Sequence, residues 1–406
     1  MTGWLNIVGI GAGGINDLSP TALTLIKTAD LLVGGNRHLS MAPNDNANRL
    51  VWSFPLDGIV EQITEARDQN VVVLATGDPM SFGIGSTLTR HFAAEDLTIL
   101  PAPGAFSLAA ARMGWPLHTC TCLTLHGRPL ELLHHHLLPN ARLLILSHDG
   151  TTPQKVAETL CDAGFEPSLI TVLENMGAEA ESTRTGSATD WDTAPTEDLN
   201  TIAVACIAGP EARYLPPVAG LPDDVFVHDG QMTKQIMRAA TLSALAPLPG
   251  QYLWDLGAGC GSVAIEWLRA AQDVQGQGAR ATAVEKDPKR SAMMAQNANR
   301  LGTPFLDIVT AETESTISGL DDPDAVFIGG GLSKSDLVDT VWARLRDRGR
   351  LVANVVTLEG ERALLDAHAR YGGELSRIAV SHAAPVGGLT GWRPAMPVTQ
   401  WSVVKS

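Results

Sequence analysis

The sequence predicts a two-part α/β protein in which each part is built on a largely parallel sheet. Two observations lead to this fold class. Short apolar runs that end at glycine or proline turns alternate with stretches suited to helices, which is typical of strands joined by helical crossovers. The alternation stops once, in the proline- and glycine-rich stretch 209–224, and then begins again. We therefore expect two domains joined by a linker.

The N-terminal half is expected to form two lobes. Strands of the first lobe are predicted at Leu5–Ile10, Leu31–Val33, Val71–Ala75 and Leu97–Leu100, each followed by a helix such as Leu18–Ala29. Strands of the second lobe are predicted at Leu143–Leu146, Ile170–Leu173 and Thr201–Ala208. The first domain is then residues 1–210, with lobes of about 1–113 and 114–210, and the linker is 211–224.

The C-terminal half, residues 225–406, is expected to form a Rossmann-like domain. Its strands are predicted at Tyr252–Leu256, Ala281–Glu285, Ala325–Ile328 and Arg350–Val356. The region Pro397–Val404 alternates in polarity, which predicts an antiparallel partner in a hairpin at the edge of the sheet.

Composition excludes several classes of function. The chain has 406 residues and a formal net charge of −15, and an acidic surface repels nucleic-acid phosphates and anionic membranes. No apolar stretch reaches the roughly 18 residues that a membrane helix needs, and no Lys or Arg precedes the first apolar run. We therefore expect a cytoplasmic protein without a nucleic-acid or membrane partner.

Cysteines and histidines give no pattern that predicts a metal site. The five cysteines lack zinc-ligand spacing, and Cys120 and Cys122 are better explained as reduced thiols than as a metal or redox pair. The run His134-His135-His136 lies in a leucine-rich helical stretch, where adjacent side chains point in different directions. The prediction is therefore that no metal is bound.

The sharpest motif of the C-terminal half runs from Asp255 to Gly261, with glycines at 257, 259 and 261. It follows a strand and opens a predicted helix, Val263–Ala271, so that glycines and free N–H groups meet at one turn. At the end of the next strand, Glu285 could accept hydrogen bonds from ribose hydroxyls. The spacing differs from the G-x-G-x-x-G of dinucleotide sites. A structural turn or another nucleotide remains the alternative.

This motif resembles the class I methyltransferases. The resemblance implies that S-adenosylmethionine is bound by Asp255, Gly257, Gly259 and Glu285, with Ala311 near the adenine. The family's usual Gly-Asp/Glu-Ala-Pro turn is replaced by 310–313, Thr-Ala-Glu-Thr. Further stretches resemble the decarboxylating corrin branch of these enzymes: 226–234, 324–331 and 349–359.

The N-terminal half carries a second set of motifs. They are Gly-Ile-Gly-Ala-Gly at 9–13, Thr-Gly-Asp-Pro-Met-Ser-Phe-Gly at 76–83, and the stretches 35–39, 125–129 and 147–150. Together they resemble the tetrapyrrole methylase family, class III, although Ala12 replaces a common proline. The resemblance implies a two-lobed fold that binds S-adenosylmethionine between its lobes. The cofactor-binding residues carried over are Gly9, Gly11, Gly77, Asp78 and Met80.

The two halves in this order resemble the fused methyltransferases of cobalamin biosynthesis. That resemblance implies precorrin-6Y as substrate, methylation at meso positions 5 and 15, loss of CO2 from the ring C acetate, and precorrin-8X as product. It further implies one S-adenosylmethionine site in each domain and a homo-oligomer.

Three cations near the start of the C-terminal domain are candidates for catalysis. We hypothesise that His228, Lys234 or Arg238 anchors substrate carboxylates and that a nearby acid delivers a proton for decarboxylation. The family often has Thr-Lys-Arg-Glu here, whereas Gln235 follows Lys234. Lys234 and Arg238 are four residues apart on a predicted helix and could instead form a solvated face.

Three other functions are alternatives to this one. A class III enzyme acting on ribosomal RNA or protein fits poorly with the acidic charge and with the second domain. A nicotinamide oxidoreductase fits poorly with the glycine spacing. A chain with one catalytic domain and one scaffold domain is compatible with the sequence.

Overall fold

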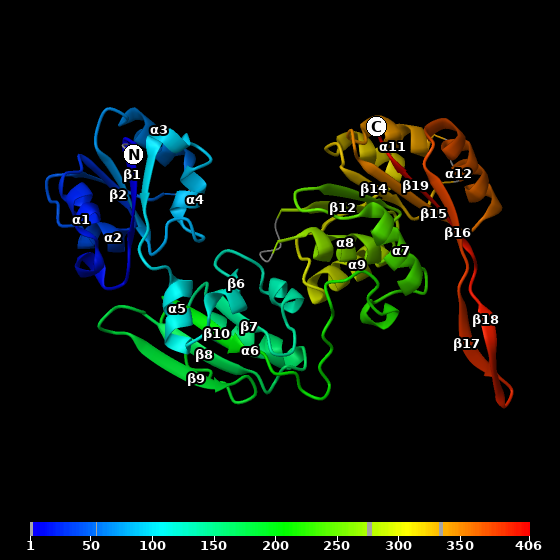
Figure 1. Ribbon diagram of the computed structural model, residues 1–406, viewed down its shortest axis with the longest axis horizontal. Helices are drawn as coiled ribbons and strands as arrows, with labels where there is room; N and C mark the ends of the chain where they lie inside the picture. The colour runs from blue at the N-terminus through cyan, green and yellow to red at the C-terminus, as the bar shows by residue number, and fades with distance from the viewer. Residues whose placement is uncertain (1–2, 54, 274–277, 333–335) are drawn as a thin grey trace. The chain divides into compact units, whose positions relative to one another are not determined.

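The computed structural model describes residues 3–53, 55–273, 278–332 and 336–406. Contacts between residues divide the chain into two compact units. The first unit is Met1–Arg128 with Pro139–Ala212, and the second is Pro129–Leu138 with Arg213–Ser406. Both are α/β, which confirms the predicted fold class (Figure 1).

The first lobe of the first unit is a parallel sheet of strand order β3-β2-β4-β1-β5. Its strands are β1 (Leu5–Ile10), β2 (Leu31–Gly34), β3 (Asn48–Val51), β4 (Val71–Thr76) and β5 (Leu97–Leu100). Its helices are α1 (Pro20–Lys27), α2 (Asn36–Met41), α3 (Asp57–Glu65) and α4 (Ile84–Leu88). Side chains alternate along β1: Val8 packs in a core with α1 and α2, whereas Ile7 packs in a core with α3.

The second lobe is a mixed sheet of order β6-β7-β10-β8-β9. Its strands are β6 (Thr121–Thr124), β7 (Arg142–Leu146), β8 (Leu169–Glu174), β9 (Ser182–Ser187) and β10 (Asn200–Ala205). Its helices are α5 (Ala105–Met113) and α6 (Thr152–Asp162). Because β6 is parallel to β7, and β10 is antiparallel to both β7 and β8, the carboxyl ends of β6, β7 and β8 share one edge.

The second unit is built on a seven-stranded sheet of order β13-β12-β11-β14-β15-β19-β16. Its strands are β11 (Tyr252–Leu256), β12 (Arg280–Glu285), β13 (Asp307–Thr310), β14 (Ala325–Ile328), β15 (Arg350–Val355), β16 (Glu374–Ile378) and β19 (Val398–Val404). Its helices are α7 (Gln235–Leu245), α8 (Ser262–Ala271), α9 (Pro288–Arg300), α10 (Thr313–Thr316), α11 (Leu337–Arg344) and α12 (Leu358–Tyr371). A short 3-10 helix, η4 (Leu130–His135), also belongs to this unit.

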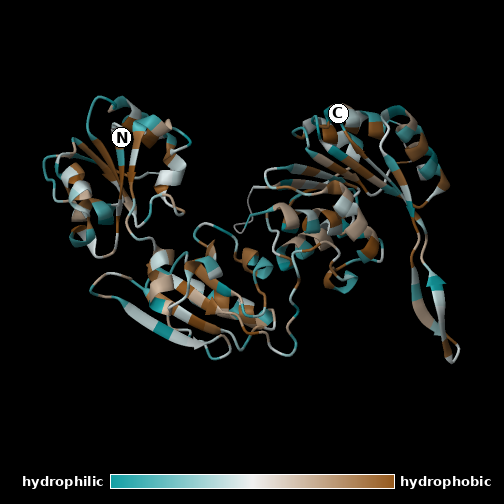
Figure 2. Ribbon diagram, in the orientation of Figure 1, coloured by the Kyte–Doolittle hydropathy of each residue, from teal (hydrophilic) through white to brown (hydrophobic). Residues whose placement is uncertain are grey.

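Two cores hold the seven-stranded sheet between its helices. Leu253 packs in the core with α7, α8 and α9, and its neighbour Trp254 packs in the core with α11 and α12. Figure 2 shows the central strands as hydrophobic, as expected for a sheet that is covered on both faces. This arrangement leaves the ends of the strands as the place for a ligand.

Strand β19 lies between β15 and β16 and pairs antiparallel with both, which confirms the predicted antiparallel pairing of Pro397–Val404; β16 is the outermost strand. After β16 the chain forms a separate hairpin, β17 (Ser381–Val386) and β18 (Leu389–Pro394), which extends away from the sheet in Figure 1. In the part of the chain that the structure describes, no helix is both long enough and apolar enough to span a bilayer.

Candidate active sites at the carboxyl ends of parallel strands in two sheets

The second unit has a switch in strand order at the centre of its sheet. From β11 the chain continues to β12 and β13 on one side and then to β14 and β15 on the other. The loops that follow β11 and β14 therefore leave the sheet in opposite directions and open a crevice, which is where ligands bind in open α/β sheets. The predicted glycine motif follows β11 at this point.

The turn after β11 requires glycine at 257. Gly257 has a φ of +73°, and an added Cβ would lie 3.1 Å from the backbone nitrogen of Gly330, which follows β14. The turn is held from the other side because the N–H groups of Gly257 and Ala258 both donate to the carbonyl of Val284. The structure thus brings Gly257 and Gly259 to the crevice where the sequence motif predicted a ligand.

Two carboxyl groups flank the glycine turn. Asp255 is fully buried; its Oδ2 accepts from the N–H of Ala264 at 3.0 Å, while its Oδ1 has no hydrogen-bond partner among the described residues. Burial raises the pKa of Asp255 to about 7, the Ala264 N–H opposes that rise, and the nearby charge of Glu285 adds to it. An uncompensated, buried carboxyl of this kind marks a candidate functional site.

Glu285 closes the loop from the neighbouring strand. Its two carboxylate oxygens accept from the N–H groups of Gly259, at 2.9 Å, and Asp287, at 3.0 Å. The N–H of Ala311 donates to the carbonyl of Glu285, so this residue of the next loop also reaches the site. Each carboxylate oxygen can accept a further bond, so Glu285 keeps capacity for ligand hydroxyls.

The segment before α7 lines the other side of the glycine turn, and sequence reasoning missed the residue that holds it there. Asn297 of α9 is fully buried, accepts from the N–H of Val227, and donates to the carbonyls of Val227 and Cys260. It thereby joins the segment to the turn. Asn297 carries no local motif, and only its long-range contacts reveal it.

His228 and Lys234 lie on this segment. The imidazole of His228 is half-buried, and its Nδ1 accepts from the N–H of Gly230 at 2.9 Å. Lys234 is exposed and forms the N-cap position of α7. Asp229, between them, is paired with Arg290 at 2.8 Å, and the hydrogen bond from Arg290 lowers the pKa of Asp229. His228 is therefore half-buried and Lys234 exposed, both on the segment that Asn297 joins to the turn.

Arg238 occupies a different environment. Its side chain is completely buried and pairs with Glu266 of α8 at 2.5 Å and with Asp223 at 3.1 Å. It also donates to the carbonyls of Thr233 and Leu221. With its guanidinium committed to these partners, Arg238 does not fit the predicted role of anchoring a substrate carboxylate.

The first unit gathers its predicted residues at one sheet edge. Strand β1 lies between β4 and β5, so the loops after these three parallel strands are neighbours. An added Cβ at Gly9 would lie 1.9 Å from the carbonyl oxygen of Gly77 and 2.7 Å from the nitrogen of Ala102. Glycine at position 9 is therefore what lets the three loops close on one another. The N–H of Gly77 donates to Ile10, and its carbonyl accepts from Ala102.

The loop after β4 presents the remaining predicted residues. Asp78 is half-buried, and its Oδ1 accepts from the N–H of Met80 at 2.9 Å, which fixes a tight turn. The side chain of Met80 is 45% exposed. Gly11, in the loop after β1, has an open environment in which an added Cβ would meet only Asp17, at 3.7 Å. The structure thus brings Gly9, Gly77 and Asp78 together and leaves Gly11 and Met80 accessible.

Two further groups of motif residues lie at the ends of strands in this unit. His38 of α2 is buried against Thr76, the last residue of β4, at 3.2 Å; burial and then Arg37 lower its pKa to about 4, so it is neutral near pH 7. In the second lobe, the rings of His126 and His148 lie 5.3 Å apart after the parallel strands β6 and β7. The sequence singled out both stretches without assigning them a role.

Comparisons with known proteins follow the same division into halves. The chain matches the tetrapyrrole (corrin/porphyrin) methylases over residues 5–192 and the precorrin methyltransferase domain over residues 224–405. It is 45% identical, over 403 residues, to the precorrin-6Y C(5,15)-methyltransferase (decarboxylating) of a Sinorhizobium species, with 99% of this chain and 96% of that protein covered. The chain belongs to the precorrin-6Y C(5,15)-methyltransferase (decarboxylating) family.

Two shorter relatives from Salmonella typhimurium divide the activities of this family between them. A cobalt-precorrin-7 C(5)-methyltransferase is 30% identical over 177 residues, 44% of this chain and 87% of that protein. A cobalt-precorrin-6B C(15)-methyltransferase (decarboxylating) is 32% identical over 184 residues, 44% of this chain and 92% of that protein. The predicted resemblance is confirmed, and membership of this family favours a methyltransferase that uses S-adenosylmethionine over a nicotinamide oxidoreductase.

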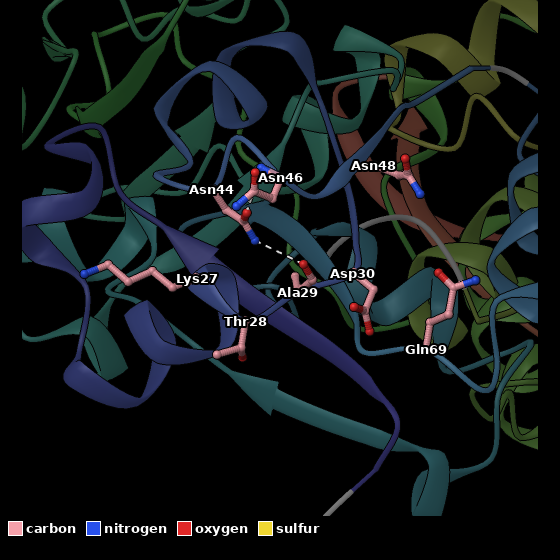
Figure 3. Close-up of a pocket in the computed structure, with 8 residues that line it drawn as sticks. All are labelled: Lys27, Thr28, Ala29, Asp30, Asn44, Asn46, Asn48 and Gln69. Atoms are coloured by element: carbon pink, nitrogen blue, oxygen red, sulfur yellow. Dashed lines mark hydrogen bonds between the residues drawn. The ribbon is translucent and has the colours of Figure 1, made fainter.

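A hollow in the surface of the first lobe lies elsewhere. It is lined by Lys27, Thr28, Ala29, Asp30, Asn44, Asn46, Asn48 and Gln69 (Figure 3). These residues come just before β2, β3 and β4 or, for Asn48, begin β3, so they lie at the amino ends of the strands, opposite the glycine loops. The amide of Asn44 donates to the carbonyls of Ile26 and Ala29, which gives it a structural role in this loop. Among the described residues no cluster of three metal-ligating side chains is found.

Proposed function

We propose that this chain converts precorrin-6Y to precorrin-8X by methylating meso positions 5 and 15 and removing CO2 from the acetate of ring C. The observation that carries this conclusion is the relative named for this activity, which is 45% identical along practically the whole of both chains. The two glycine-lined sheet edges, one in each unit, support two separate methyl transfers.

We infer that the second unit binds S-adenosylmethionine through Asp255, Gly257, Gly259 and Glu285, beside Ala311. The unpartnered Oδ1 of Asp255 supports this assignment, because a cationic ligand would favour the charged carboxylate that burial now disfavours. The close approach of Gly257 to Gly330 supports it as well, since a side chain at position 257 would meet the backbone that follows β14.

S-adenosylmethionine, when bound, supplies a methyl group that its positively charged sulfur has already activated. The work left to the chain is to align the meso carbon with this group and to exclude water. Alignment of this kind contributes roughly 7–11 kcal/mol to catalysis. The glycine turn suits the task because it is fixed by backbone bonds to Val284 and lies on fully buried strands.

We infer a second S-adenosylmethionine site in the first unit, formed by Gly9, Gly11, Gly77, Asp78 and Met80. Its support is the close packing of the loops after β1, β4 and β5, which presents backbone groups beside the carboxylate of Asp78. The match of residues 5–192 to the tetrapyrrole methylases supports the same place.

We assign methylation at position 5 to the first unit, and methylation at position 15 with decarboxylation to the second. The support is that separate relatives carry these two activities, each aligned with 44% of this chain. The match of residues 224–405 to the precorrin methyltransferase domain supports the second part of this assignment.

We propose that His228 and Lys234 bind carboxylates of the substrate at the second unit. Decarboxylation breaks the bond between the acetate methylene and its carboxyl carbon, leaves the electron pair in the conjugated ring, and needs one proton to complete the new methyl group. Lys234 is exposed at the N-cap of α7 and is a suitable cation for the substrate's carboxylates. For Arg238 we propose a structural role instead, because its partners are Glu266 and Asp223.

Mass spectrometry of a precorrin-6Y incubation tests the proposed reaction. The expected product has gained two methyl groups and lost one CO2. Titration with S-adenosylhomocysteine tests the number of sites, with two per chain expected. A product with a single added methyl, or a single binding site, would leave one unit as a scaffold and overturn the bifunctional assignment.

We also propose that the chain self-associates through the hairpin β17–β18. The hairpin and the turn that follows it expose four large apolar side chains: Val386 (64%), Leu389 (80%), Trp392 (77%) and Met396 (68%). Exposed apolar groups of this density are typical of an interaction surface. Light scattering should give a lower mass for Leu389→Ser/Trp392→Ser than for the unmodified chain, and an unchanged mass would contradict the proposal.

A further inference from the structure

The connection between β6 and β7 of the first unit does not stay within that unit. Residues Pro129–Leu138 pack in the second unit. The chain therefore crosses from one unit to the other three times: after Arg128, after Leu138 and after Ala212. Only the last of these crossings lies in the proline- and glycine-rich stretch that the sequence identifies as a linker. We call Pro129–Leu138 the strap.

The leucines of the strap are as buried as side chains of a hydrophobic core. Its leucines Leu132, Leu133 and Leu137 are 4%, 0% and 3% exposed. An apolar segment that merely linked two strands over the surface would leave such side chains in water. The strap therefore has a docking role that the connection itself does not require.

The surface that receives the strap includes Gly302, just after α9. Gly302 has a φ of +76°, and an added Cβ would lie 2.8 Å from the backbone nitrogen of His135 and 3.1 Å from its Cβ. The backbones of Gly302 and His135 are in contact here, and a side chain at position 302 would separate them. The fit is thus specific to glycine.

The ring of His135 completes the contact. It faces Arg269 of α8, and its Nδ1 is buried without a hydrogen-bond partner among the described residues. Arg269 is itself buried and donates to the carbonyls of Leu301 and Leu215. Burial, followed by the charges of Arg269 and His136, lowers the pKa of His135 to about 3, so the ring docks in its neutral form.

We propose that the strap is a built-in docking segment, by which the chain that forms the first unit holds the second unit through the surface of Arg269, Leu301 and Gly302. Both ends of the strap continue into the first unit, so the second unit is connected to the first through the strap as well as through the linker. The partner of this surface is the chain's own segment, and the proposal does not depend on which reaction either unit catalyses.

Cutting the linker in the folded, full-length protein tests the strap. A protease recognition site can replace residues 216–219, which are all exposed, with Val218 67% exposed. After cleavage, the two fragments should remain together as a 1:1 complex on size exclusion with light scattering at micromolar concentration. Separation of the unmodified fragments would overturn the proposal.

A matched pair of glycine variants shows whether the strap is what holds the fragments together. Gly302→Ala places a Cβ against His135, whereas Gly278→Ala changes a glycine of similar φ, +85°, that has no other group within 4 Å. Gly302→Ala should weaken association of the fragments at least tenfold, and Gly278→Ala should not. Equal association in both variants would contradict the proposal.

A second variant, Leu133→Ser, distinguishes loss of strap docking from a folding defect caused by Gly302→Ala. It alters the strap and leaves α8 and α9 unchanged, so it should also release the fragments. In the uncut chain, hydrogen exchange of 130–138 should be faster in Leu133→Ser, while exchange in β11 and α8 stays slow. Unchanged exchange in the strap would likewise overturn the docking role.

Discussion

Both units have a glycine-lined sheet edge, but the glycine turns of the two edges are held in place by different interactions. In the second unit, a fully buried carboxyl group, Asp255, stands under the glycine turn, and Glu285 holds the turn through a hydrogen bond to Gly259. In the first unit, the turn is made by three loops whose backbones touch at Gly9 and Gly77. One edge is thus built around a buried carboxyl group, and the other around the absence of a side chain.

The largest effect is expected at Gly9. In Gly9→Ala, the new Cβ would lie 1.9 Å from a backbone oxygen that is itself hydrogen-bonded, so the loops after β1, β4 and β5 must separate. We expect binding of S-adenosylhomocysteine to fall from two sites per chain to one, with at least a 100-fold loss of affinity at the missing site. Isothermal titration calorimetry measures this directly.

Gly58→Ala is the matched control for Gly9→Ala. Gly58 lies in α3 of the same lobe, and an added Cβ there has no heavy atom within 4 Å. Alanine in a helix is favoured over glycine by roughly 1 kcal/mol, so this variant should keep both sites and gain slight stability. Two sites in Gly9→Ala would show that the packing of the loops does not form a binding site.

The second prediction separates structural from substrate-binding cations in the second unit. Arg238→Met removes one partner of a buried ion pair and leaves Glu266 buried with its charge. Such a loss typically costs about 3–5 kcal/mol of folding free energy. Denaturant unfolding should show this loss, whereas the KM for precorrin-6Y should stay within about twofold in protein that remains folded. A large rise in KM with unchanged stability would restore the substrate-binding role.

The third prediction concerns the cost of burying Asp255. In the ligand-free chain its pKa is about 7, well above that of an aspartate in an unfolded chain. As the pH rises from 4 to 8, the unfolded state loses this proton before the folded state does, so Asp255 lowers the stability of the fold. Asp255→Asn should therefore be more stable than the unmodified chain at pH 8, by up to about 4 kcal/mol, and similar near pH 4.

Asparagine at 255 keeps the acceptor for the N–H of Ala264 but removes the charge. We therefore expect the more stable variant to bind S-adenosylhomocysteine more weakly at the second unit. Thermal unfolding of the ligand-free chain at both pH values checks the first effect, and calorimetry checks the second. A variant that is less stable at pH 8 would show that the charge stabilises the fold.

Much of the fold could be predicted because local sequence signals mark where its central strands begin and end. β5, β11 and β14 have the predicted bounds, since each is an apolar run next to a turn. β3 and the hairpin β17–β18 were missed, because they are exposed and polar enough to lack a clear apolar pattern. The predicted leucine-rich helix around His134 is a 3-10 helix whose docking depends on Gly302, far away in the sequence.

The candidate sites also could be predicted only where their residues lie close together in the sequence. The glycine turn and Glu285 could be found because turn, strand and acid lie in one short stretch of sequence. The burial of Arg238 could not be found from its own neighbours, since its partner Glu266 is 28 residues away. A signal was nevertheless present: Glu266 stands inside the apolar run of α8, and a charge in such a run needs a buried counter-ion.

The smallest effect is expected at Lys234, and it sharpens the contrast with Arg238. Lys234 is exposed at the N-cap of α7, so Lys234→Ala should leave the unfolding free energy within about 0.5 kcal/mol. If its ammonium holds a substrate carboxylate, the KM for precorrin-6Y should rise about tenfold, equivalent to about 1.4 kcal/mol. Lys155→Ala, an exposed change of equal charge on α6, should alter neither quantity. Equal KM values in the two variants would place Lys234 on a solvated face and leave His228 as the remaining candidate.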